Sequence, residues 1–154
     1  MIKCLLFLIS TSILLGGSAS AAGDRDFGLG IILGEPTGIS GKLWTGGRSA
    51  VDGAVAWSTD RNSALHLHVD YLLHDFALIT VEEGRLPFYY GIGGRIKFSE
   101  NNSDDFIGIR VPIGLEYIFA AARVDIFFEI VPILDLAPDT DFDFNAAIGA
   151  RYFF

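Results

Sequence analysis

Cysteine and methionine are almost missing from this chain. The only cysteine is Cys4 and the only methionine is Met1. Cys4 lies before the apolar run of residues 5–15, whereas the lipid-acceptor cysteine of a lipoprotein follows such a run. Once the N-terminal segment is removed, no thiol remains, which excludes disulfides, thiolate chemistry and cysteine-based metal sites.

Lysine is also scarce, because Lys42 and Lys97 are the only lysines after Lys3. The surfaces of soluble proteins are usually rich in lysine. The formal net charge is −8 and becomes −9 when Lys3 is lost with the N-terminal segment. An acidic chain lacks the basic stripe that nucleic-acid binding requires, so we expect no nucleic-acid partner.

No apolar run after residue 21 is long enough for a transmembrane helix. Residues 1–21 are predicted to be a cleaved signal peptide, with Lys3 as the positive region and a short apolar run behind it. Ala19-Ser20-Ala21 supplies the small residues that signal peptidase needs. An uncleaved membrane anchor is the alternative. Residues 22–154, about 133 residues, then form one domain.

What the chain has in abundance is alternation with a period of two, which indicates β-strands. A longer connection over about 75–86 could add a β extension at 77–81, and 132–141 is expected to be the last loop. The predicted strands cover about 26–34, 38–45, 50–58, 64–74, 87–98, 106–119, 123–133 and a last strand after residue 141.

The two faces of these strands differ in charge. One face is free of Asp, Glu, Lys and Arg, whereas the other combines glycine and small residues with charges of both signs, Asp52, Arg123 and Asp143 among them. Such a face suits the inside of a narrow barrel, where charges must pair and bulk is limited. We predict a lumen charge network of Lys42, Asp70, Arg95, Lys97, Arg110, Glu116, Asp125, Glu129 and Arg151.

These patterns predict an all-β fold, an eight-stranded up-and-down antiparallel transmembrane β-barrel over residues 22–154, in the outer membrane of a Gram-negative-type bacterium. A sheet that spans lipid must close on itself, because lipid offers no hydrogen bonds. Aromatic side chains are expected at both interfaces. One rim would carry Phe27, Tyr71, Phe88, Tyr90, Tyr117, Phe119, Tyr152 and Phe154, and the other Trp57, Phe98 and Phe144.

The C-terminal residues support export and membrane assembly. Gly149, Tyr152 and Phe154 fit the pattern Gly-x-x-aromatic-x-aromatic, with Phe154 last. This pattern resembles the C-terminal assembly signal of bacterial outer-membrane barrels, which implies the barrel-assembly machinery as a partner. The alternative is an ordinary terminal strand of a soluble sheet.

Three stretches carry a resemblance to a family. Residues 30–38 (GIILGEPTG), 89–95 (YYGIGGR) and 133–138 (ILDLAP) are similar to those of a poorly characterised family of small bacterial outer-membrane β-barrel proteins. The resemblance covers the whole mature chain and implies location and architecture. It implies no activity and no site residue.

Histidines gather on one predicted strand. His66, His68 and Asp70 share a face, with neighbours about 7 Å apart. Two imidazoles and a carboxylate are ligands that Zn²⁺ accepts, so these residues are weak metal candidates. The favoured interpretation is that they join the interior network with Arg95 and Arg110, and we expect no cofactor.

An acidic run has part of the spacing of a calcium loop, but Phe144 and Ala150 stand where that loop needs glycine and glutamate. A polar barrel rim is the favoured interpretation, able to bind the divalent cations that bridge lipopolysaccharide phosphates. The residues in this run are Asp139, Asp141, Asp143 and Asn145.

A lipid A-modifying enzyme is a further alternative, since such barrels use a histidine with a serine and an acid. The ingredients are His66 or His68, Ser58 or Ser63, and Asp60 or Asp70. No motif joins them, and a nucleophile must lie within hydrogen-bond reach of its base. We therefore predict no enzyme and assign no catalytic residue.

The favoured function is that of a small integral outer-membrane protein with a structural or interaction role, whose lumen is filled by paired charges. Eight strands leave room only for side chains or one small ligand. The first alternative is porin-like transport, or binding of a small or hydrophobic molecule through the barrel. Expected partners are outer-membrane lipids and lipopolysaccharide, and the sequence sets no oligomeric state.

Overall fold

The computed structural model describes residues 26–58, 64–99 and 105–154, and these residues form strands, turns and loops. The predicted signal peptide, residues 1–21, lies outside the described residues. In this part of the chain no helix is long and apolar enough to cross a membrane. The regular secondary-structure elements of the described residues are β-strands.

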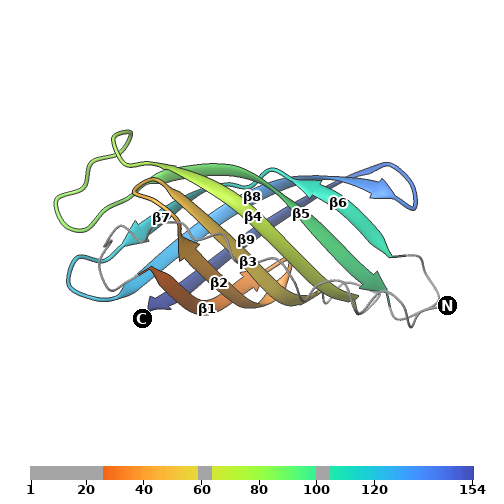
Figure 1. Ribbon diagram of the computed structural model, residues 1–154, viewed down its shortest axis with the longest axis horizontal. Coiled ribbons are helices and arrows are strands. Elements are labelled where there is room, and N and C mark those ends of the chain that lie inside the picture. The colour runs from red at the N-terminus through yellow and green to blue at the C-terminus, as the bar shows by residue number, and fades with distance from the viewer. Residues whose placement is uncertain (1–25, 59–63, 100–104) are drawn as a thin grey trace, which may run out of the picture.

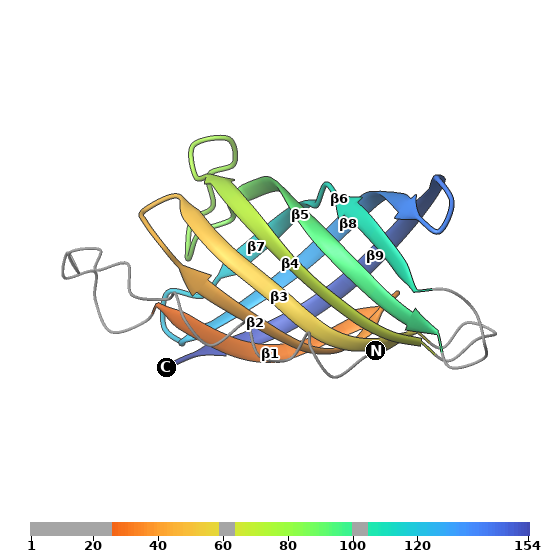
Figure 2. The ribbon, with the colours of Figure 1, turned by 45° about the vertical axis from the view of Figure 1, so that its right-hand side comes forward.

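The described strands close into a ring in which every pairing is antiparallel, as Figures 1 and 2 show. Sheet order runs β4-β3-β2-β1-β9-β8-β6-β5, and pairing of β4 with β5 joins its two ends. A closed sheet has no edge strand with unpaired backbone groups, so no helix has to cover an edge. The strands are β1 (Phe27–Gly34), β2 (Thr37–Trp44), β3 (Ser49–Ser58), β4 (Ala64–Asp75), β5 (Phe88–Ser99), β6 (Phe106–Arg110), β7 (Ile113–Ile118), β8 (Val124–Ala137) and β9 (Asp141–Phe153).

The strand predicted over 106–119 is interrupted, so that prediction is corrected to two shorter strands, β6 and β7. Both pair with β5 on one side and β8 on the other, so together they fill one place in the ring. The break falls at Val111 and Pro112, and proline has no N–H to donate. Pro112 O instead accepts from Gly91 N at 3.0 Å. The ring therefore has eight places, as predicted.

The expected last loop over 132–141 is wrong. β8 continues to Ala137 and β9 begins at Asp141, so only residues 138–140 connect them. Pro132, the first residue of the predicted loop, pairs with Phe144 within the β8–β9 ladder. Its carbonyl accepts a 3.0 Å hydrogen bond from Val111 N, so Pro132 still contributes an acceptor to the sheet.

The connection of residues 76–87 forms no strand at 77–81, so the possible β extension is absent. Its second half instead runs beside β7, where Arg85 and Ile118 form an isolated bridge. The loop lies at the end of the barrel that carries the C-terminus, named here the C-terminal end (Figure 1).

The two faces of the ring have opposite chemistry. Outward side chains are large and apolar, with Val69 61 % exposed and Ile92 60 % exposed. Inward positions hold buried charged groups together with apolar groups such as Leu72 and Phe127. The fold class is thus confirmed: an all-β, up-and-down antiparallel barrel whose apolar face points outward.

Candidate functional site

The lumen is crossed by ion pairs that lie in layers along the barrel. Nearest the C-terminal end, Lys42 Nζ donates to both carboxylate oxygens of Glu116 at 2.6 Å. His74 Nε2 lies 3.2 Å from Glu116 Oε2 and 2.9 Å from Lys42 Nζ. All three side chains are fully buried. Trp44 covers this layer, with Lys42 Nζ 4.3 Å from its ring centre.

Arg151 forms the next layer, on β9. Its Nη1 lies 3.4 Å from Asp52 Oδ2, and its Nε lies 3.4 Å from Asp125 Oδ1. The guanidinium carbon is 3.9 Å from the centre of the Phe127 ring, a cation–π distance. Two carboxylates and an aromatic face thus neutralise and cover one buried cation.

Arg110 occupies the middle of the lumen, at the end of β6. Its Nε donates to Asp70 at 3.0 and 3.1 Å, and its Nη2 lies 3.6 Å from Glu129 Oε1. Glu129 also accepts a 3.1 Å hydrogen bond from Tyr89 Oη. This layer joins four inward side chains from β4, β5, β6 and β8, which are neighbours along one half of the ring.

Arg95 forms the layer farthest from the C-terminal end. Its Nε donates to Asp135 Oδ1 at 3.0 Å, and its Nη2 donates to Asp143 Oδ2 at 2.9 Å. Asp135 was missing from the predicted network, because the sequence analysis assigned it to a loop. Lys97 is half-buried and forms no ion pair with any described residue.

The structure therefore brings eight of the nine predicted network residues into ion pairs, and adds Asp52, His74, Asp135 and Asp143. Asp52 and Asp143 belong to the charged face predicted from the sequence, His74 follows from the alternation along its strand, and Asp135 would have followed from a longer β8. A buried charge is stable only when paired, so the layers act as a set. Chemically, they fill the lumen and connect its walls.

The weak metal candidates do not converge. The rings of His66 and His68 meet edge to face at a centroid distance of 5.5 Å, and His68 Nε2 is 4.0 Å from Asp70 Oδ2. Asp70 is already held by Arg110. Among the described residues, no three His, Cys, Asp or Glu side chains are grouped to hold a metal ion.

The residues of the calcium-like run also diverge. Asp139 is exposed, Asp141 Oδ1 accepts from Phe142 N at 2.9 Å, and Asn145 is buried in the lumen. Asp143 pairs with Arg95. These side chains share a rim without surrounding one point.

The residues of the catalytic alternative cannot be joined into a triad from the described chain. Ser63 and Asp60 lie outside the described residues, and Ser58 is placed only as the end of β3. His66 and His68 are 2 % and 5 % exposed inside the lumen. Both imidazoles therefore face the charge network.

The C-terminal assembly residues lie on a strand that pairs on both sides, with β1 and β8. Tyr152 and Phe154 point outward, and their rings meet edge to face at 5.2 Å. Gly149 points inward, where a Cβ would meet the Phe127 ring. The motif thus combines an outward aromatic pair with space for a lumen side chain.

Comparisons with known proteins match this architecture. The model of a family described as Protein of unknown function (DUF3996) matches residues 19–151. A search of curated proteins finds no match. The structure resembles the crystal structure of the N-terminal β-barrel domain of Pseudomonas aeruginosa OprF, with a TM-score of 0.62 and 13 % identity. The similarity covers 84 % of this chain and 98 % of that domain, and at this identity it shows the fold alone.

Proposed function

We propose, from the premise that the chain belongs to the DUF3996 family of proteins of unknown function, that it is a small integral outer-membrane protein. Its role is structural or interaction-type: a closed, charge-filled barrel that presents its rims on the two sides of the membrane. The proposal rests on the faces of the barrel and the contents of its lumen.

The observation that carries the proposal is the outward face. Val69, Ile92 and Ile39 are 61 %, 60 % and 57 % exposed, and apolar side chains continue around the ring on every strand. Monomeric soluble proteins rarely expose contiguous apolar patches beyond a few hundred Å². Hydrocarbon is the solvent that suits such a face, and a closed sheet leaves no unpaired backbone edge in it.

The filled lumen supports a structural role over transport. Eight places in the ring leave an interior only wide enough for side chains. Layers around Glu116, Arg151, Arg110 and Arg95 occupy that interior and are fully or nearly fully buried. Moving a solute through them would require several buried ion pairs to separate, each of which leaves uncompensated charge.

Export and assembly follow the same proposal. Residues 1–21 direct the chain across the inner membrane, and the barrel-assembly machinery binds the terminal strand through Gly149, Tyr152 and Phe154. Both termini of the barrel then lie on the periplasmic side. Outer-membrane lipids and lipopolysaccharide are the molecules that contact the outward face.

Membrane fractionation with semi-native electrophoresis tests the proposal. We expect the protein in the outer-membrane fraction, and we expect unboiled samples to migrate differently from boiled ones, because a closed barrel resists detergent. Recovery as a soluble periplasmic protein without a heat shift would contradict the proposal.

Planar-bilayer recording tests the filled lumen separately. The purified barrel should give no stable single-channel conductance, whereas an open pore of the same size would. The control is Arg151→Ala, which removes one of the two fully buried arginines of the lumen and so opens its layer. Steady conductance in the unmodified protein would replace the structural role with porin-like transport.

A further inference from the structure

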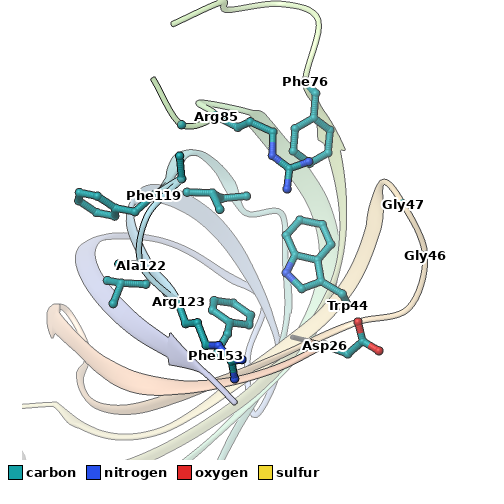
Figure 3. A pocket seen from close by; sticks show the side chains of 14 residues that line it. Asp26, Trp44, Gly46, Gly47, Phe76, Arg85, Phe119, Ala122, Arg123 and Phe153 are labelled. Atoms are coloured by element: carbon teal, nitrogen blue, oxygen red, sulfur yellow. The ribbon is translucent and has the colours of Figure 1, made fainter. Parts of the chain in front are cut away.

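The C-terminal end of the lumen opens into a cavity of about 430 Å³, named here the vestibule. Its lining comes from strand ends, from Gly46 and Gly47, from the 119–123 turn and from the 76–87 loop, and is drawn in Figure 3. Clefts that hold small molecules have volumes of roughly 300–1,000 Å³. The vestibule therefore has the size of a site for one small ligand.

The vestibule is closed at its inner side. Trp44 lies across it, with its ring centroid 4.4 Å from that of His74 in the layer below. Phe153, only 7 % exposed, lines it from β9. Beneath these rings, Lys42 and Glu116 fill the lumen. A molecule that enters from the C-terminal end thus meets aromatic faces and stops there.

Two arginines give the vestibule its charge. Arg85 comes from the 76–87 loop beside β7, and Arg123 comes from the turn before β8. Both side chains line the cavity (Figure 3). Neither forms an ion pair with a described carboxylate, and Asp26 is the only acidic residue in the lining. Planar guanidinium groups favour bidentate binding of carboxylate and phosphate.

Arg85 is held in place before any ligand arrives. Its backbone exchanges two hydrogen bonds with Ile118, of 3.0 and 2.8 Å. Its guanidinium carbon lies 5.0 Å from the centre of the Phe76 ring. One residue before it, Gly84 has a φ of +74°, and Tyr117 Oη donates to Glu83 O at 2.8 Å. The backbone of Arg85 is thus ordered before binding, so binding a ligand does not have to order this part of the loop.

We propose that the vestibule binds a small amphipathic anion: an acidic head at Arg85 or Arg123, and an apolar or aromatic body against Trp44 and Phe153. The assignment goes beyond the proposed function, since a structural barrel needs no ligand. The blind inner wall makes the vestibule a binding site and not the entrance to a channel.

Tryptophan fluorescence provides a direct readout of the vestibule. The chain has two tryptophans, and Trp57 lies on the outward face at the opposite end of the barrel. In Trp57→Phe protein, Trp44 is the only reporter. The protein is placed in phosphatidylcholine nanodiscs, its insertion is checked by the heat shift, and 4-butylbenzoate is titrated in.

Saturable change of Trp44 emission is expected with 4-butylbenzoate. The uncharged and cationic matched probes, 4-butylbenzyl alcohol and 4-butylbenzylamine, should bind at least about tenfold more weakly, because hydrogen bonds to a charged group are the stronger ones. No saturable binding, or equal binding of all three probes by inserted protein, would overturn the proposal.

Substitutions locate the site. Arg85→Gln with Arg123→Gln should weaken 4-butylbenzoate binding by about tenfold or more. Arg48→Gln is the matched control, an exposed arginine at the same end that does not line the vestibule. Ala122→Phe should block the cavity without removing charge, and it leaves Trp44 as the only tryptophan. Equal loss in Arg48→Gln, or unchanged binding in both vestibule variants, would overturn the site.

A final arm separates a soluble ligand from a membrane lipid. Replacing phosphatidylcholine with phosphatidylglycerol offers the arginines an anionic headgroup. The affinity for 4-butylbenzoate should change by no more than a few fold between the two lipids, because a ligand enters the vestibule from the C-terminal end of the lumen. Complete competition by the lipid would overturn the assignment to a small soluble anion.

Discussion

Lys42 and Glu116 show what a single buried ion pair does in this barrel. Their 2.6 Å contact is fully buried, with His74 as the third member. Removing one partner leaves an uncompensated charge in the lumen, which typically costs about 3–5 kcal/mol. Replacing both partners by apolar groups costs much less, because no charge is then left buried.

Lys42→Met and Glu116→Met should therefore each lower the free energy of unfolding by about 3–5 kcal/mol, and the double variant should regain most of that loss. Urea unfolding in lipid vesicles, read by the heat shift, measures all three variants. Additive losses in the double variant would mean that the two side chains do not act as a pair.

Gly84 is the residue whose backbone positions Arg85. With φ at +74°, an added Cβ would lie 2.7 Å from Ile118 O and 2.9 Å from Tyr117 Oη. Gly84→Ala should lower the free energy of unfolding by about 1–3 kcal/mol and weaken 4-butylbenzoate binding. Gly94→Ala is the control, since it does not line the vestibule and only Gly108 O, at 3.8 Å, lies near its Cβ position. Equal behaviour of the two variants in urea unfolding would contradict this account.

The direction of each side chain, into or out of the barrel, could be predicted, because side chains alternate between the two faces along each strand. The pairing of individual charges could not, since partners such as Arg95 and Asp135 come from strands far apart in the chain. Asp135 was missed because residues 132–141 were predicted to be a loop. Proline is compatible with a strand where no donor is needed.

Among the elements, the terminal strand β9 has the clearest consequence for assembly. It pairs with β1 and β8, so its docking closes the ring. Tyr152→Ser with Phe154→Ser should reduce the folded, heat-shifted fraction in the outer membrane several-fold. Phe142→Ser is the control, because Phe142 is 66 % exposed at the other end of the same strand. An equal reduction in the control would remove the special role of the C-terminal motif.

Element positions were predictable from the sequence, whereas two of their boundaries were not. The strand over 106–119 is broken at Pro112, and β8 passes through Pro132. Both prolines occur in alternating apolar sequence, and only the neighbouring strands decide which one interrupts pairing. Pro132 O accepts a hydrogen bond from Val111 N, so Pro132 on β8 lies beside the break at Val111 and Pro112.

At the scale of the whole molecule, the barrel combines an apolar exterior with a charged interior, which is the reverse of a soluble protein. The charge-free face of each strand in the sequence predicts this inversion. The vestibule was not predicted, because its lining comes from the ends of separate strands and from the turns and loops that join them.

The central claim is that the outward face of the barrel contacts lipid. Measuring whether lipid or water surrounds residue 69 tests this claim most directly. Val69 lies in the middle of β4 and pairs with Gly53 and Gly94, which leaves space for a larger outward side chain. In Trp44→Phe, Trp57→Phe protein, Val69→Trp is compared with Leu78→Trp on the exposed 76–87 loop. Vesicles of brominated lipids and aqueous acrylamide serve as quenchers.

We predict that bromines near the bilayer centre quench the fluorescence of Val69→Trp most strongly, and that acrylamide quenches Leu78→Trp but barely affects Val69→Trp. Strong acrylamide quenching of Val69→Trp, without quenching by brominated lipid, would show that water covers the outward face and would contradict a membrane-spanning barrel.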